Sequence, residues 1–214
     1  MGSSAASACA AAVLVNELLN HPLERRDLIP FALDGEMTAS GSRHGDNVVP
    51  TMLGGLFLIR DILSLDYHRI YTPPGLYMAI LLPSFLLQTK QARSILKPEV
   101  PLHDMIRQSA NLGSFIVGMN TGDLDLIHRS LEDVVIEPQR KHLIPLFDQV
   151  KECAMKSGAL GCSISGAGPA IFSLCQEKTQ AGEIASAMKK IYEDEKIEAR
   201  TFVAGINNEG TILK

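Results

Sequence analysis

The sequence predicts an α+β protein with two domains, and three observations lead to this fold class. Hydrophobic residues make up 46% of the 214 residues, which is enough for a sizeable core. From residue 77 onward the patterns run strand, helix, strand, strand, helix, strand, the split βαβ order of ferredoxin-like domains. The breakers Pro73, Pro74 and Gly75 stand just before that pattern. We therefore expect domains at residues 1–74 and 75–214.

Composition excludes several classes of protein. The net charge of −4 argues against a nucleic-acid partner. Apolar runs stay shorter than the roughly 18 residues of a membrane span, and the start does not resemble a signal peptide. The 4 cysteines form no CxxC pair and indicate reduced thiols. We expect a cytoplasmic protein that binds neither nucleic acid nor membranes.

The first domain opens on an Ala-rich helix over residues 4–19, with Ser3 or Ser4 as its N-cap and Gly2 ahead of it. Helix N-termini carry free N–H groups and the positive end of the dipole, so this start is either an anion site or an ordinary capped helix. A second helix over residues 27–39, capped by Asp27, carries Glu36. We expect a polar loop over 40–47, a turn or short helix over 48–53 and a buried strand over 56–60.

The second domain alternates strands and helices. We expect strands over residues 77–82, 160–165, 170–175 and 199–204, with one further short strand in the tail over 205–214. We expect helices over residues 89–96, 103–119, 123–130, 140–156 and 179–192.

Several polar residues are candidates for chemistry. Ser4 and Glu36 are hard oxygen ligands that suit Mg²⁺ beside a nucleotide, although Glu36 by itself fits a solvated helix position. A second cluster could converge on one small ligand or form a plain polar turn: His44, Asp46 and Asn47. The spacings match no zinc site, Walker loop or GxSxG motif.

Two arginines and one small-residue loop complete the candidates. Arg93 and Arg140 stand near predicted helix starts, where a guanidinium can bind a carboxylate or phosphate or form a surface ion pair. The segment from Ser165 to Gly168 is either a plain hairpin turn or a loop shaped for close backbone approach.

Three segments together resemble the three motifs of the GHMP kinases: GSSAAS at residues 2–7, HGDNVVP at 44–50 and GCSISGAGP at 161–169. Within that superfamily the chain looks most like the homoserine kinases, through VVPTMLGG, TKQAR and EPQRKHLIP. The resemblance covers essentially the whole chain. It implies the two-domain GHMP kinase fold, with a partial ribosomal-S5-domain-2-like N-terminal domain and a ferredoxin-like C-terminal domain.

The resemblance also implies an activity, which is transfer of the γ-phosphoryl of ATP to the hydroxyl of L-homoserine in threonine biosynthesis. By resemblance, Mg²⁺ is held by Ser4 and Glu36, and Thr89 lies near the transferred phosphoryl. The residues implied to bind ATP phosphates are Gly2, Ser3, Ser4, Ala5, Ser7, Ser165, Gly166 and Gly168. The residues implied to bind homoserine are His44, Asp46, Arg93 and Arg140. Family analogy also suggests a homodimer.

Asn47 stands where mevalonate-type members carry an aspartate base. An asparagine cannot accept a proton at neutral pH. Phosphoryl transfer has a loose transition state, so positioning and charge neutralisation can supply most of the catalysis. We therefore expect Asn47 to position the substrate, while the proton leaves late to the phosphate or to water.

Two other functions stay open at this point. One is a GHMP kinase with a different alcohol substrate, although two arginines suit an amino-acid carboxylate better. The other is a truncated ligand-binding module without turnover. A panel of alcohols with ATP separates the first from homoserine phosphorylation, and binding without turnover identifies the second.

Relatives carry further residues before the phosphate loop, so we interpret the chain as a fragment. We expect the 214-residue chain, expressed alone, to be inactive and poorly folded in its first 70 residues or so, because its Ala-rich helix lacks a sheet to pack on. Circular dichroism during urea unfolding and an ATP-coupled assay check this. Cooperative unfolding together with phosphorylation of homoserine would contradict it.

Overall fold

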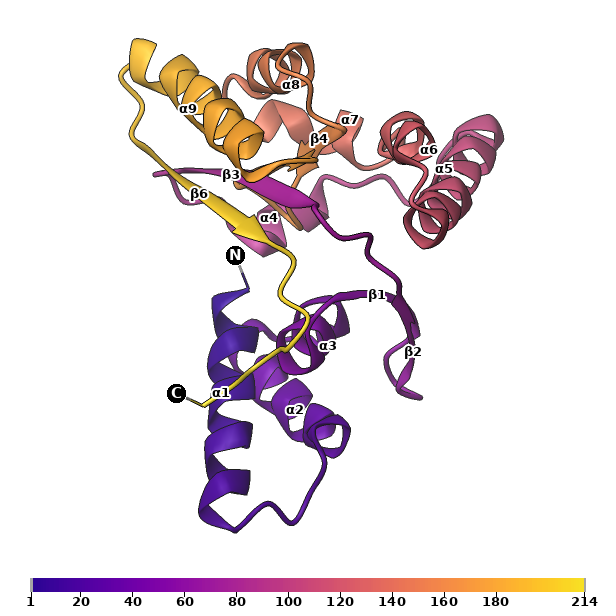
Figure 1. Cartoon of the computed structure of the whole chain (residues 1–214), viewed down its shortest axis with the longest axis vertical. Helices are drawn as coiled ribbons and strands as arrows, with labels where there is room; N and C mark the ends of the chain where they lie inside the picture. The colour runs from indigo at the N-terminus through magenta and orange to yellow at the C-terminus, as the bar shows by residue number, and fades with distance from the viewer. Residues whose placement is uncertain (1, 214) are drawn as a thin grey trace. The chain divides into compact units, whose positions relative to one another are not determined.

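The computed structural model describes residues 2–213, apart from the side chain of Ser40. Contacts divide the chain into two compact units (Figure 1). The first unit comprises Gly2–Thr72 and the tail that starts at Ile206, and the second unit comprises Pro73–Gly205. Each unit is described by itself.

Three helices form the core of the first unit: α1 (Ser3–Leu18), α2 (Ile29–Ser40) and α3 (Gly45–Leu53). A 3₁₀ turn, Arg25–Leu28, leads into α2, and an antiparallel hairpin of β1 (Leu56–Asp61) and β2 (Asp66–Ile70) follows α3. The buried apolar residues of this core are Ala5, Cys9, Leu28, Ile29, Ala32, Leu33, Val48, Val49 and Met52. Small residues on α1 let the other two helices approach it closely.

Three details of the first unit differ from expectation. The N-cap of α1 is Gly2, in the left-handed region at φ 54°, so Ser3 and Ser4 lie in the first turn rather than at the cap. Asp27 does not cap α2, because its carboxylate accepts a hydrogen bond from the Glu24 N–H at 3.3 Å within the preceding turn. Helix α3 starts at Gly45, and the strand β2 was not anticipated.

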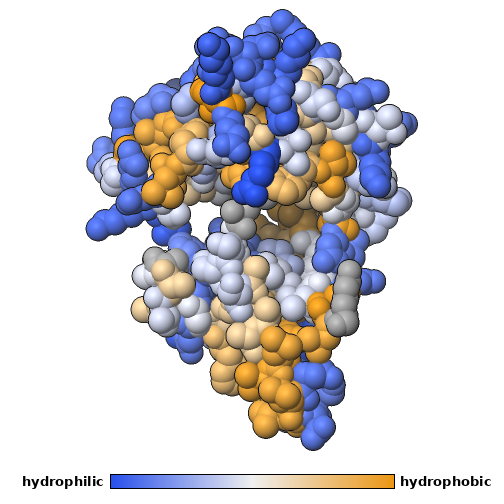
Figure 2. All heavy atoms as spheres, turned by 90° about the vertical axis from the view of Figure 1, so that its left-hand side faces the viewer, coloured by the Kyte–Doolittle hydropathy of each residue, from blue (hydrophilic) through white to orange (hydrophobic). Residues whose placement is uncertain are grey.

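Large apolar side chains near the end of α1 and in the segment that follows it are exposed to solvent. Figure 2 shows hydrophobic side chains gathered at the lower end of the view, where α1 ends. The exposed ones include Leu14, Val15, Leu18, Leu19 and Leu23. Helix α1 therefore covers its own core with small side chains and leaves its large ones outside.

The second unit is built on a four-stranded sheet in the order β4-β5-β3-β6, with antiparallel neighbours throughout. Its strands are β3 (Tyr77–Pro83), β4 (Gly161–Ile164), β5 (Ile171–Cys175) and β6 (Ala199–Gly205). Helices α8 (Phe147–Lys156) and α9 (Lys178–Asp194) bury their apolar faces against the sheet (Figure 1). This is the expected split βαβ arrangement, so the α+β fold class is confirmed.

Four helices are inserted between β3 and α8: α4 (Thr89–Ser94), α5 (Leu102–Thr121), α6 (Leu124–Ser130) and α7 (Glu137–Arg140). The single helix expected over residues 140–156 is wrong. The chain forms α7, a 3₁₀ turn over Lys141–Leu143 and then α8. Pro145 has no N–H to donate, and Leu146 takes φ 63°, so a continuous helix is impossible there.

The tail packs on the rest of the first unit through backbone and side-chain hydrogen bonds. The Gly55 N–H donates to the Asn207 carbonyl at 2.7 Å, and the Thr211 hydroxyl donates to the Thr51 carbonyl at 2.9 Å. Residues 206–213 contain no strand, contrary to expectation. Within residues 2–213, no helix is both long and apolar enough to cross a membrane.

Gly54 allows the tail to pack closely on the first unit, because glycine has no Cβ. It has φ 70° and ψ 159°, and a Cβ placed there would lie 2.4 Å from the Gly210 nitrogen. We expect Gly54→Ala to lower the free energy of unfolding by at least about 2 kcal/mol, through backbone strain and overlap with the tail. Urea denaturation followed by circular dichroism measures this.

Gly113→Ala is the matched control, because a Cβ at this position in α5 meets no atom within 4 Å. Removing a helical glycine should stabilise the protein by about 0.5–1 kcal/mol. Equal stability of the two variants would contradict the claim that close packing of the tail requires glycine at position 54.

Candidate active site

The start of α1 lies against the side chain of Asn47. A Cβ on Gly2 would stand 3.2 Å from the Asn47 amide oxygen, so the approach depends on glycine. Ser3 and Ser7 are exposed, Ser4 is half-buried, and Ala5 is packed in the core. The first-turn N–H groups of α1 and the positive end of its dipole therefore stand beside a polar amide.

Helix α3 begins next to this point. Its first turn contains Asp46 and Asn47, and His44 stands at the N-cap position, so these residues do not form the polar loop that was expected. Gly45 is buried, and a Cβ there would lie 2.3 Å from Ile62 Cδ1, so the β-hairpin packs directly on the helix start. The contact of Gly2 with Asn47 joins the first turns of two helices, each with its positive dipole end there.

Glu36 is a buried carboxylate on α2, with 2% of its surface exposed. The neighbouring Gly35 packs on α1, since a Cβ on Gly35 would lie 3.0 Å from the Ala8 Cβ. Ser4 lies one turn before Ala8 on the same side of α1. Ser4 and Glu36 therefore both border the contact between α1 and α2.

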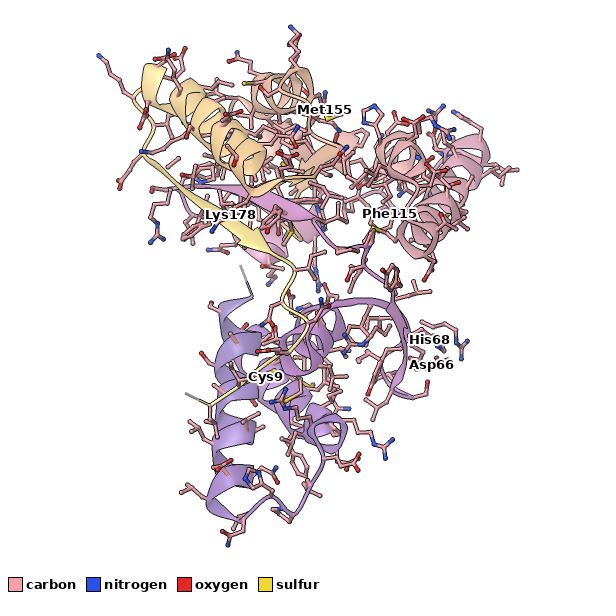
Figure 3. The ribbon with its side chains drawn as sticks, viewed as in Figure 1. Cys9, Asp66, His68, Phe115, Met155 and Lys178 are labelled. Carbon is pink, nitrogen blue, oxygen red and sulfur yellow. The ribbon has the colours of Figure 1, made fainter. Side chains whose placement is uncertain are left out.

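The pKa of Cys9 depends on the charge of Glu36 near the contact between α1 and α2. Its thiol lies inside the first unit (Figure 3) and donates to the Val48 carbonyl at 3.6 Å. Burial, and then the negative charge of Glu36, raise the pKa of Cys9 to about 11. The Glu36 carboxylate is thus close enough to α1 to act on its first turns.

The donor set fits Mg²⁺ bound beside a nucleotide. A carboxylate and a hydroxyl are hard oxygen ligands, and Mg²⁺ usually takes only one or two protein ligands with phosphates and waters. No group of three or more His, Cys, Asp or Glu side chains among residues 2–213 could hold a metal by itself. Ser4 and Glu36 suit such an ion only together with ligands that a nucleotide brings.

In the second unit, Arg140 joins two of the predicted segments. Its Nε donates to the Ala92 carbonyl of α4 at 2.9 Å, and its Nη1 donates to the Gly166 carbonyl at 3.1 Å. Thr89 begins α4 and Arg93 lies one turn later, both exposed. Arg140 therefore serves as a brace, a role that the sequence did not predict.

Two positive charges meet at this brace. Burial and then the nearby charge of Arg93 lower the pKa of Arg140, whereas the charge of Asp133 raises it. Neighbouring guanidinium groups repel one another, and an anion between them relieves the repulsion. Asp133 already supplies one negative charge near Arg140, and a further anion beside the two guanidinium groups would be stabilised as well.

The loop between β4 and β5 is a tight turn. The Ser165 N–H donates to the Ala170 carbonyl at 2.8 Å, and the Gly168 N–H donates to the Ser165 carbonyl at 3.0 Å. Gly166 and Gly168 have φ of 60° and 83°, a region that favours glycine. Both alternatives drawn from the sequence are thus compatible with the loop, which is a hairpin turn with an accessible backbone.

Sequence reasoning missed Glu137. This residue is only 7% exposed, and its carboxylate accepts hydrogen bonds from Ser163 and Lys151. It belongs to the EPQRKHLIP segment, where only Arg140 attracted attention. The spacing between Glu137 and Ser163 carries no signal, because the sheet topology brings the two residues together.

The chain matches two family models, one described as the GHMP kinases N terminal domain over residues 1–55 and one as GHMP kinases C terminal over residues 115–194. A crystal structure of homoserine kinase from Cytophaga hutchinsonii superposes with a TM-score of 0.96 at 43% identity, covering 98% of this chain and 67% of that one. The chain belongs to the homoserine kinase family.

Curated homoserine kinases agree with this assignment. The enzyme of Chloroherpeton thalassium is 43% identical over 212 residues, which is 99% of this chain and 66% of the relative. That of Xylella fastidiosa strain 9a5c is 40% identical over 214 residues, or 100% and 65%. The chain thus spans about two thirds of the length of these homoserine kinases. A mevalonate kinase from L. major, at 17% identity and a TM-score of 0.75, shares the fold.

The thiol of Cys9 can test the charge on Glu36 in this member of the family. Cys9 is fully buried and its pKa is about 11, so alkylation at pH 8 should be slow, because the thiol must both become exposed and ionise. Glu36→Gln removes a negative charge, so it should lower the pKa of Cys9 and speed alkylation at pH 8. Mass spectrometry of the labelled peptides measures both rates.

Cys153, which is half-buried on α8 in the second unit, is the internal control. Its alkylation rate should not respond to Glu36→Gln. An unchanged rate at Cys9 in the variant would show that Glu36 carries no charge beside α1.

Proposed function

We propose that this chain is part of an enzyme that transfers the γ-phosphoryl group of ATP to the side-chain hydroxyl of L-homoserine, which yields O-phospho-L-homoserine and ADP; the chain alone is expected to be inactive. The observation that carries the proposal is the likeness to a solved homoserine kinase at 43% identity over 98% of the chain. A GHMP kinase that acts on another alcohol remains the competing outcome of the test below.

The first unit supplies phosphate binding in this proposal. The N-terminal turn of α1 offers backbone N–H groups to phosphate oxygens, at the positive end of the helix dipole. The residues assigned to this role are Gly2, Ser3, Ser4, Ala5 and Ser7. Ser4 and Glu36 would hold Mg²⁺, which neutralises charge on the phosphates when bound. In the second unit, Ser165, Gly166 and Gly168 are assigned to phosphate binding as well.

Asn47, Thr89 and the polar residues of α3 act on the acceptor in this proposal. The homoserine oxygen forms a bond to the γ-phosphorus as the bond from that phosphorus to the bridging oxygen of ADP breaks. Asn47 orients the acceptor but cannot take its proton, which leaves late to a phosphate oxygen or to water. Thr89 would lie beside the transferred group, with His44 and Asp46 holding the acceptor.

Arg93 and Arg140 would hold the carboxylate of homoserine. Their mutual proximity supports this role, since two guanidinium groups side by side favour an anion. Arg140 has five N–H donors, and the bonds to Ala92 and Gly166 use only part of them. The same residue can therefore serve as brace and ligand.

We further propose a cytoplasmic enzyme of threonine biosynthesis that works as a homodimer without nucleic-acid or membrane partners. The net charge of −4 supports the exclusion of nucleic acid. The remaining statements rest on the family resemblance.

The test compares homoserine with an amino alcohol of the same length that lacks the carboxylate. Arg93→Ala should raise KM for homoserine about 10–100-fold by loss of a charge-assisted hydrogen bond, and should leave the amino alcohol unaffected. Glu36→Gln should reduce kcat more than Asn47→Ala does, because Asn47 only orients. Coupled ADP assays measure both constants.

Arg107→Ala is the control, since Arg107 pairs with Glu132 in an exposed ion pair on α5. The chain is assayed alone and fused to the part of the Cytophaga hutchinsonii homoserine kinase that it does not cover. Preference for mevalonate or galactose over homoserine would overturn the assignment, and so would ATP binding without turnover in the fusion.

A further inference from the structure

Glu137 is a buried charge in the second unit that the proposed reaction does not use. The residue starts α7, and its side chain is 9% exposed. Burial of a carboxylate is costly unless charge and hydrogen bonds compensate it. A buried Glu137 carboxylate therefore needs an ion-pair partner and hydrogen-bond donors close to it.

The partners come from two other elements. Lys151 of α8 forms an ion pair with Glu137 Oε1, and the Ser163 hydroxyl donates to Glu137 Oε2 at 2.7 Å. Ser163 lies on β4, two residues before the turn that begins at Ser165. Each carboxylate oxygen thus holds a different element.

The opposite end of the same helical turn holds two more segments. Arg140 donates to carbonyls of Ala92 in α4 and Gly166 in the β4–β5 turn. The Gln139 side-chain oxygen accepts from the Lys97 N–H at 2.8 Å, just beyond α4. Three residues of α7, namely Glu137, Gln139 and Arg140, therefore tie together α4 and the residues just after it, the β4–β5 turn, strand β4 and helix α8.

We propose that Glu137 is a positioning residue, which fixes α7 so that Arg140 holds α4 and the β4–β5 turn in register. Neither Glu137 nor Lys151 touches the carbonyls that Arg140 binds, so the effect passes through α7 itself. Its consequence for catalysis rests on the proposed function, whereas the mechanical link does not.

The negative charge on Glu137 strengthens its contacts with Lys151 and Ser163. Glu137→Gln keeps the size of the side chain but removes the charge that pairs with Lys151, and its amide nitrogen can bond to Ser163 only by donating to the hydroxyl. Asp148→Asn is the matched control on α8. Asp148 pairs with Lys141 at 2.9 Å, but both side chains are well exposed, so the pair contributes little.

Hydrogen exchange of the full chain tests the link without any substrate. The reporters are the Gly168 amide, bonded to Ser165 at 3.0 Å, and the Ala92 amide, bonded to Gln88 at 3.0 Å. Glu137→Gln should speed exchange at both by about tenfold or more, with strands β3 and β5 unchanged. Asp148→Asn should leave both reporters within about twofold of the parent.

Ser163→Ala is a milder second variant for the case in which Glu137→Gln does not fold. It removes one hydrogen bond to Glu137 and keeps the ion pair with Lys151. It weakens the same anchor, so it should speed exchange at both Gly168 and Ala92, by less than Glu137→Gln does. The proposal is overturned if folded Glu137→Gln leaves both reporters at the parent rate, or if exchange rises equally across β3 and β5. If Glu137→Gln does not fold, exchange at the parent rate at both reporters in Ser163→Ala also overturns it.

Activity separates this proposal from the proposed function. In the active fusion, Glu137→Gln should lower kcat/KM for homoserine about tenfold at a temperature where the variant is folded. A parent fusion without activity would refute the proposed function, and the exchange rates would still decide the role of Glu137.

Discussion

The approach of Gly2 to Asn47 is the constraint on which the first unit's candidate site depends. It requires a residue without a side chain at the start of α1, and it requires α3 to begin at Gly45 so that Asn47 falls in a first helical turn. Close packing of Gly35 on Ala8 then brings α2, with the buried Glu36, along the same face of α1. Small residues thus allow three helices to present polar groups near one helix end.

In the second unit, charged side chains hold the inserted segments in place. Its inserted segments are short, and α4 and α7 have too few residues to be stable by themselves. Side-chain contacts hold these short helices in place, because Glu137 and Arg140, at the two ends of α7, bind different segments. Buried ionic groups of this kind contribute specific placement more clearly than they contribute stability.

Much of the secondary structure could be predicted from local patterns. The four strands of the main sheet and the helix α9 followed from apolar runs and apolar periodicity. The helix expected over residues 123–130 is also present as α6, where the Asp123 side chain accepts from the Leu126 N–H at 2.9 Å. The errors lie where backbone geometry competes with pattern. Pro145 broke a helix whose apolar spacing looked continuous, and Asn47 entered a helix although its neighbours resemble a polar turn.

The sequence by itself determined the family, the α+β class and the residues that the motifs contain, because each of these depends on local order along the chain. Only the tertiary structure decided that Gly2 faces Asn47, that Glu36 is buried and that Arg140 braces two segments. It also decided that Glu137 anchors α7. These are contacts between residues far apart in sequence, and the packing of helices and strands sets them, not the spacing of residue types.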